Sequence, residues 1–160
     1  MFWKSKPKDT TIDEHVFSLI LPGPWSRQPS PDPTRWTYAS QSGLEQLTVS
    51  VFSSTQPMSA DEQHETLKDV LVVRRRAEEE AASGTTMTDT TLTEVGGVPG
   101  ARYDGFHSSA RRRLSCLLLC SSTAVTVFYY EALDLTEQEA ASRAEAILGS
   151  VRVPIRSAGR

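Results

Sequence analysis

Three consecutive arginines are the most informative group of side chains for recognition. Arg111, Arg112 and Arg113 follow a serine-containing turn between two predicted strands. Three cations at one end of a hairpin could dock an acidic partner. The alternative is a solvated turn whose charges keep the strand edges from aggregating. We therefore take these arginines as candidate protein-binding residues.

Histidines are the residues from which a metal site would be built. His15, His64 and His107 fall in different predicted elements, and His64-Glu65 is not followed by a second histidine four residues after the first. A protein metal site needs ligands at short helical or turn spacing. We expect no metal and no cofactor.

The two cysteines, Cys116 and Cys120, fall in one apolar run with strand parity. Their Cα atoms would then lie about 13 Å apart, beyond the roughly 7 Å limit for a disulfide. We expect two reduced core thiols, with an intermolecular bridge as the alternative. Apolar surroundings raise the pKa of a thiol, so neither resembles an activated nucleophile.

Sequence patterns typical of catalysis are missing from the protein. It contains no G-x-S-x-G turn for a nucleophilic serine and no glycine-rich phosphate loop. The acidic run Glu78-Glu79-Glu80 is interpreted as a solvated helix face, because consecutive helical residues point in different directions. We expect a protein that is not an enzyme.

Two neighbouring strands carry apolar side chains on both faces. Leu117 and Leu119 would point to one face of the first strand, and Phe128 and Tyr130 share one face of the second. Such strands are either sandwiched between layers or present an apolar patch to a partner. The four residues are therefore further candidates for protein binding.

Hydrophobic periodicity predicts seven strands and two helices. The strands are expected near residues 16–21, 35–39, 47–52, 86–95, 99–107, 114–121 and 123–133. Capping boxes at Ser59 and Thr136 predict helices over residues 60–82 and after residue 136.

The short connections among the last four strands favour an antiparallel meander, because parallel crossovers need a dozen or more residues. The expected order is βββ-α-ββββ-α. The predicted fold class is α/β in the broad sense, α+β in detail, with a twisted antiparallel sheet of six to seven strands packed by two main helices. We expect a single domain over residues 14–155, a flexible segment over residues 1–13 and a flexible tail over residues 156–160.

Composition narrows the choice of partner. The 160 residues are 38% hydrophobic and 23% charged, with a formal net charge of -3. No overall basic field exists to drive nucleic-acid binding. The apolar run over residues 16–21 is too short for a signal sequence or a membrane span. We expect no nucleic-acid partner, no membrane insertion and a cytoplasmic location.

Two local motifs resemble a known fold group. The run Phe17-Ser18-Leu19-Ile20-Leu21-Pro22-Gly23-Pro24-Trp25 is similar to the opening F-x-L-x-L-P-x-x-W of the PsbP-like fold, which includes the bacterial DcrB-like proteins. Residues 94–101 resemble the central hairpin of that group, in which G-x-P-A is usual, with Gly100 inserted before the alanine. The closing Ser150-Val151-Arg152-Val153 is also similar.

The resemblance implies binding. Proteins of this fold serve as accessory proteins of photosystem II, partners of a nuclear-transport GTPase and chaperones or adaptors for secreted bacterial effectors. The expected partner is one cognate protein, such as an effector or a toxin that this protein recognises as chaperone, adaptor or immunity protein. The alternatives are an accessory subunit of a larger complex, a homodimer formed through the apolar strand face, and a small-molecule-binding protein or enzyme with an unrecognised site.

Overall fold

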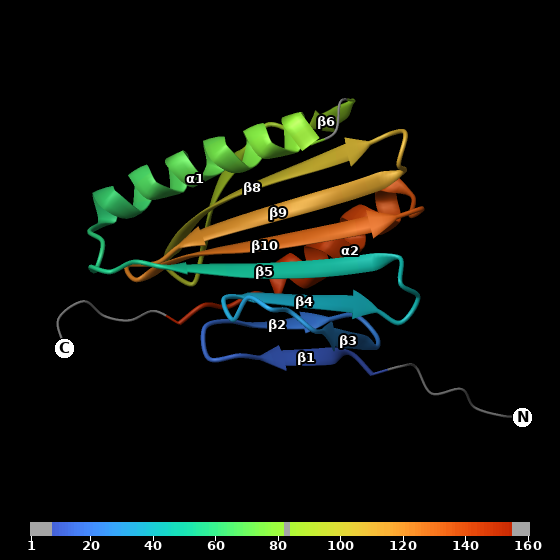
Figure 1. Cartoon of the computed structure of the whole chain (residues 1–160), viewed down its shortest axis with the longest axis horizontal. Helices are drawn as coiled ribbons and strands as arrows, with labels where there is room; N and C mark the ends of the chain where they lie inside the picture. Colours follow the sequence, from blue (N-terminus) through green and yellow to red (C-terminus); the bar gives the residue numbers. More distant parts are fainter. Residues whose placement is uncertain (1–7, 82–83, 155–160) are drawn as a thin grey trace, which may run out of the picture.

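Alternating apolar and polar residues build one large antiparallel sheet (Figure 1). The computed structural model describes residues 8–81 and 84–154. Its elements are β1 (Thr10–Asp13), β2 (Ser18–Leu21), β3 (Trp25–Gln28), β4 (Arg35–Ser40), β5 (Glu45–Ser53), α1 (Ala60–Ala81), β6 (Thr85–Met87), β7 (Thr91–Val95), β8 (Val98–His107), β9 (Arg112–Cys120), β10 (Ala124–Leu133) and α2 (Glu137–Gly149).

The large sheet contains eight strands in the order β3-β4-β5-β10-β9-β8-β6, and β7 pairs with β8 beside β6. Every pairing is antiparallel. The predicted α+β class, antiparallel sheet and order of strands and helices are confirmed. β10 lies between β5 and β9, so the last strand joins the two halves of the sequence.

The described part of the protein has three more strands than the seven that were predicted, because one predicted strand is divided and two short strands are additional. The strand predicted over residues 86–95 is divided into β6 and β7, and β3 and β1 are additional. β3 lies between the strands predicted near residues 16–21 and 35–39, and it pairs with β4 as an edge strand. Short edge strands carry little periodicity because few of their residues are buried.

The expectation that residues 1–13 are flexible throughout needs correction. β1 pairs with β2 in a separate two-stranded ribbon. The Thr10 hydroxyl donates to the Gly23 carbonyl at 2.7 Å and accepts from the Trp25 amide at 3.0 Å. Backbone pairing holds this polar strand, so hydrophobic periodicity could not reveal it. Residues 1–7 and the predicted tail over residues 156–160 lie outside the described residues.

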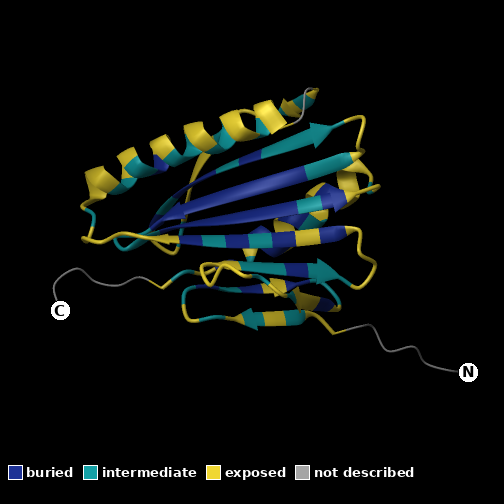
Figure 2. Cartoon of the chain, in the orientation of Figure 1, coloured by how far each residue is buried: buried dark blue, intermediate teal, exposed yellow. Residues whose placement is uncertain are grey.

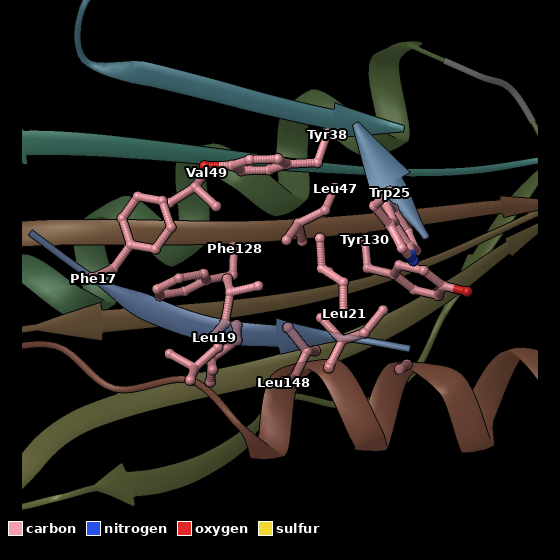
Figure 3. Packing of buried hydrophobic residues seen from close by; sticks show 14 of the residues in the cluster. Phe17, Leu19, Leu21, Trp25, Tyr38, Leu47, Val49, Phe128, Tyr130 and Leu148 are labelled. Carbon is pink, nitrogen blue, oxygen red and sulfur yellow. The ribbon is translucent and has the colours of Figure 1, made fainter. Parts of the chain in front are cut away.

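The two faces of the sheet support two separate cores. α2 and the β1–β2 ribbon cover one face, and α1 covers part of the other (Figure 1). β9 and β10 are buried along most of their length (Figure 2). On the α2 face, Phe17 packs edge-on against Phe128 with ring centroids 5.8 Å apart, and Leu148 of α2 points toward the same cluster (Figure 3).

Both predicted helix starts are confirmed. The Ser59 hydroxyl accepts from the Glu62 amide at 3.2 Å, and the Thr136 hydroxyl accepts from the Glu139 amide at 3.1 Å. These bonds satisfy amides that have no partner within the helix. Among the described residues, no helix is long and apolar enough to cross a membrane.

Candidate functional site

The three candidate arginines separate at the start of β9. Arg111 lies in the turn with φ of 50°, and its exposed side chain pairs with Asp134 at 3.2 Å. Arg112 and Arg113 then point to opposite faces of the sheet, because side chains alternate along a strand. The arginines therefore do not form one basic hairpin tip, and each has its own surroundings.

Arg112 lies on the α1 face within a network of aromatic and acidic groups. Its guanidinium donates to Glu131 at 2.7 Å and to the Tyr129 hydroxyl, and it lies 3.7 Å from a Glu78 carboxylate oxygen. Burial and the neighbouring carboxylates raise the pKa of Tyr129 above its usual range. Arg112 is thus committed to contacts that hold α1 on the sheet.

The other four candidates are in the core. Leu117, Leu119, Phe128 and Tyr130 are each no more than 3% exposed. α2 and the β1–β2 ribbon cover the face of the sheet to which they point. The interpretation of these side chains as an exposed docking patch is therefore corrected: the strands are sandwiched between layers, which was the alternative.

A cleft of about 540 Å³ lies between α2 and the β6–β8–β9 part of the sheet. Its floor is formed by side chains that point to the α2 face of β8 and β9, and α2 provides a wall. Small residues on α2, Ala140 and Ala141, leave the space open. Charged and aromatic side chains complete the lining, among them Arg102, Asp104, Phe106, Arg113, Glu137 and Glu145.

One end of the cleft is occupied by mutually paired charges. Arg102 forms an ion pair with Glu145 of α2 and lies 3.6 Å from Asp104. Asp104 also accepts a 2.5 Å hydrogen bond from the Ser115 hydroxyl. These contacts tie α2 to β8, and both carboxylates at this end have a partner.

Arg113 also lines the cleft, and it has no counterion among the described residues. Its guanidinium carbon lies 4.2 Å from the centre of the Phe106 ring. Its Nε is buried without an acceptor, and the side chain makes no hydrogen bond or ion pair with any residue of the described ranges. The terminal amino groups are not buried in the same way, so they remain available to a ligand.

Tyr130 connects this cleft to a buried charge on the far side of α2. Its ring lines the cleft, and its hydroxyl donates to Glu45 at 2.6 Å. Arg143 of α2 donates to the same carboxylate oxygen at 2.5 Å. Glu45 is 7% exposed, so this bonded pair fixes the middle of α2 on the sheet.

The thiols are unsuited to nucleophilic chemistry. Cys116 and Cys120 are both free and buried, as expected. Burial raises the pKa of each thiol to about 11. Because the thiolate is the reactive form, these cysteines are inert core residues at neutral pH.

The rings of His64 and His107 form contacts with residues that are close to them in the sequence. His107 Nδ1 accepts from the Ala110 amide at 3.1 Å, and His64 Nδ1 lies 2.8 Å from the Ala60 carbonyl oxygen. Within residues 8–81 and 84–154, no three histidine, cysteine, aspartate or glutamate side chains are grouped so as to hold a metal ion.

Sequence reasoning missed most of the cleft. Arg102, Asp104 and Phe106 alternate along one strand and therefore share a face, which was the available signal. Nothing in the sequence placed α2 over that face, so the partners Glu137 and Glu145 could not be connected to it.

No protein-family model matches the chain, and no curated protein matches it. Solved structures do. The chain is similar to cyanobacterial PsbP from Synechocystis sp. PCC 6803, with a TM-score of 0.71 and 11% identity over 91% of this chain and 92% of that one. It is also similar to LpqN of Mycobacterium tuberculosis, described as involved in cell envelope biogenesis, with a TM-score of 0.54 and 13% identity over 92% and 91% of the two chains. These likenesses show a PsbP-like fold.

Proposed function

We propose that this protein is a non-enzymatic binding module that recognises one cognate protein through the cleft beside α2. The observation that carries the proposal is the construction of the cleft. An apolar and aromatic floor, small residues on the helix wall and an unpaired arginine suit a protruding side chain or short segment of another protein.

The state of the reactive side chains supports a binding role over catalysis. The thiols of Cys116 and Cys120 are protonated and enclosed, and burial also raises the pKa of Tyr103 above its usual range. Arg102 forms ion pairs with both Asp104 and Glu145 in the cleft. Side chains that are buried or paired in this way stabilise the fold and do not present an acid and a base to a substrate.

The fold supports the same proposal more broadly. One similar structure is a cyanobacterial PsbP, and another is LpqN, which is involved in cell envelope biogenesis in Mycobacterium tuberculosis. The opening motif at residues 17–25 resembles bacterial DcrB-like proteins. We infer a bacterial, cytoplasmic protein whose partner is a secreted effector or a toxin, bound by this protein as chaperone, adaptor or immunity protein.

The test uses co-expression of this protein with each protein encoded by a neighbouring gene. A complex should form with one of them and should be measurable with purified components by isothermal titration calorimetry. Ala141→Trp would fill the cleft, because Ala141 is an exposed residue of its α2 wall. We expect this variant to lose at least tenfold in affinity.

Ala146→Trp is the matched control. Ala146 is exposed on the same helix and does not line the cleft. This variant should bind as tightly as the parent, and circular dichroism should show that both variants keep their helix content. Equal loss in both variants, or no complex with any neighbour-encoded protein, would contradict the proposal.

The kind of partner separates the two roles. A chaperone should bind an apolar helical segment of an effector. An immunity protein should bind a folded toxin domain and abolish the activity of that toxin.

A further inference from the structure

Arg113 lines the cleft with a guanidinium that has no acidic partner among the described residues. Elsewhere in and around the cleft, each arginine has an acidic partner: Arg102 has Glu145 and Asp104, and Arg143 has Glu45. Arg113 contacts the Phe106 ring but has no carboxylate within 4 Å among the described residues. A guanidinium without a counterion in a cleft is the natural receptor for an anion.

The stacking on Phe106 prepares the guanidinium for such a contact. A guanidinium held over a ring keeps its donors directed outward in its own plane, where they match the two oxygens of a carboxylate. Part of the side-chain entropy that binding would otherwise remove is already lost. The buried Nε faces the protein, so the terminal amino groups are the donors left for a ligand.

The other charges in the cleft define what can approach. Asp104 and Glu145 are engaged by Arg102, and Asp104 also by Ser115. Glu137, the first residue of α2, lines the cleft and has no ion pair within the described ranges. The two arginines and three carboxylates of the lining leave one net negative charge, and Arg113 is the arginine of the lining without an ion pair among the described residues. The cleft therefore admits a carboxylate only at Arg113 and disfavours a densely acidic segment.

We propose that the cleft beside α2 receives an acidic side chain of the partner protein, whose carboxylate is bound end-on by the guanidinium of Arg113 above the Phe106 ring. This inference rests on the proposed function and names the chemistry that the partner must supply. The negative charge of Glu137 in the cleft would repel a second acidic side chain of the partner. The neighbouring Arg111 takes no part, because its side chain lies in solvent with Asp134.

The experiment titrates the 160-residue protein with blocked tripeptides and follows the arginine Nε–Hε signals and backbone amides by NMR. The probes are N-acetyl-Ala-Glu-Ala-amide, its glutamine and lysine counterparts, and free glutarate. We expect the glutamate peptide to shift the signals of Arg113, Phe106 and Ala141 saturably. The glutamine and lysine peptides should bind at least tenfold more weakly.

Variants assign the contact. Arg113→Gln should reduce the affinity for the glutamate peptide at least tenfold, whereas Arg111→Gln, an equal change of charge outside the cleft, should leave it unchanged. Glu137→Gln should tighten binding of the same peptide, because it removes the nearest unpaired negative charge. A merely structural role for Glu137 would not produce tighter binding.

Three results would overturn the inference. Equal shifts with the glutamine peptide would show that the carboxylate is not recognised. Unchanged affinity in Arg113→Gln would show that another group binds it, and tighter binding of glutarate than of the peptide would point to a free small acid. If the neighbour-encoded partner binds and responds to Ala141→Trp while the peptides fail, the proposed function stands and only the role of Arg113 is lost.

Discussion

At the residue scale, this molecule separates side chains that are adjacent in sequence. Arg112 completes a network under α1, Arg113 faces the cleft beside α2, and Arg111 remains in solvent. Strand alternation explains the first two, and the left-handed backbone of Arg111 explains the third. A run of equal charges therefore has three different environments.

Buried ionisable groups make a prediction about alkaline pH. The fold favours the neutral thiols of Cys116 and Cys120, since their pKa rises from 9.0 to about 11. The unfolded protein then loses protons first, so their contribution to stability is complete below pH 9 and is lost as the pH rises toward 11. Each thiol can remove at most about 1.4 kcal/mol per pH unit.

Urea denaturation at intervals between pH 8 and about pH 11 measures this loss. The free energy of unfolding should fall across this range, and the slope between pH 9 and pH 10 should be smaller in Cys120→Ala. Burial also raises the pKa of three tyrosines, Tyr103, Tyr129 and Tyr130. When the pH exceeds the ordinary pKa of a tyrosine, these residues therefore lower the free energy of unfolding as well. A flat profile to pH 11 would show that the thiols titrate equally in both states.

At the scale of elements, β8 and β9 approach one another closely at Gly100. A Cβ at this position would lie 2.6 Å from Leu119 Cδ2 and 2.7 Å from the Leu118 carbonyl oxygen. Both distances are too short for real contacts. The glycine that departs from the G-x-P-A pattern of the resembled fold therefore has a local reason, the packing of β8 on β9.

Gly100→Ala should destabilise the protein by about 1–3 kcal/mol, since a strand must shift to admit the methyl group. Gly149→Ala is the control: it lies at the end of α2 with nothing within 4 Å of a new Cβ. The control substitution should leave the free energy of unfolding unchanged or raise it by up to about 1 kcal/mol, because alanine has a higher helix propensity than glycine. Chemical denaturation compares the two, and similar effects would contradict the close approach of β8 and β9.

At the scale of the whole molecule, both ends of the described sequence are tied into one structure. Ser18 exchanges backbone hydrogen bonds of 2.9 Å with Arg152, and the Ile20 amide donates to the Ser150 hydroxyl at 2.8 Å. β10 pairs with β5 from the first half and with β9 from the second. The two halves of the sequence therefore form one continuous sheet.

This arrangement predicts a single unfolding transition. All three tryptophans lie in the first 36 residues, so their fluorescence follows the first half, whereas far-UV circular dichroism also follows α1 and α2. The two signals should give the same midpoint in urea, because neither half can bury its apolar faces alone. Separate midpoints would show that the halves unfold independently.

Local sequence patterns were enough to predict the long strands and helices and the face to which each side chain of a strand points. The period-two pattern predicted that Leu117 and Leu119 face away from Cys116, and the capping boxes predicted where α1 and α2 begin. These features depend on residues close together in the sequence. The short strands β1 and β3 were missed because backbone pairing with distant residues holds them, and that pairing leaves little trace in side-chain pattern.

Which candidate residues are accessible to a partner depends on the packing of helices against the sheet. Leu117, Leu119, Phe128 and Tyr130 have the same apolar character on an open face as under a helix, so their burial depended on where α2 packed. The same packing joined Arg113 of β9 with Glu137 of α2 in one cleft. Periodicity gives the face of each element, but the contact between faces follows from burying both cores at once.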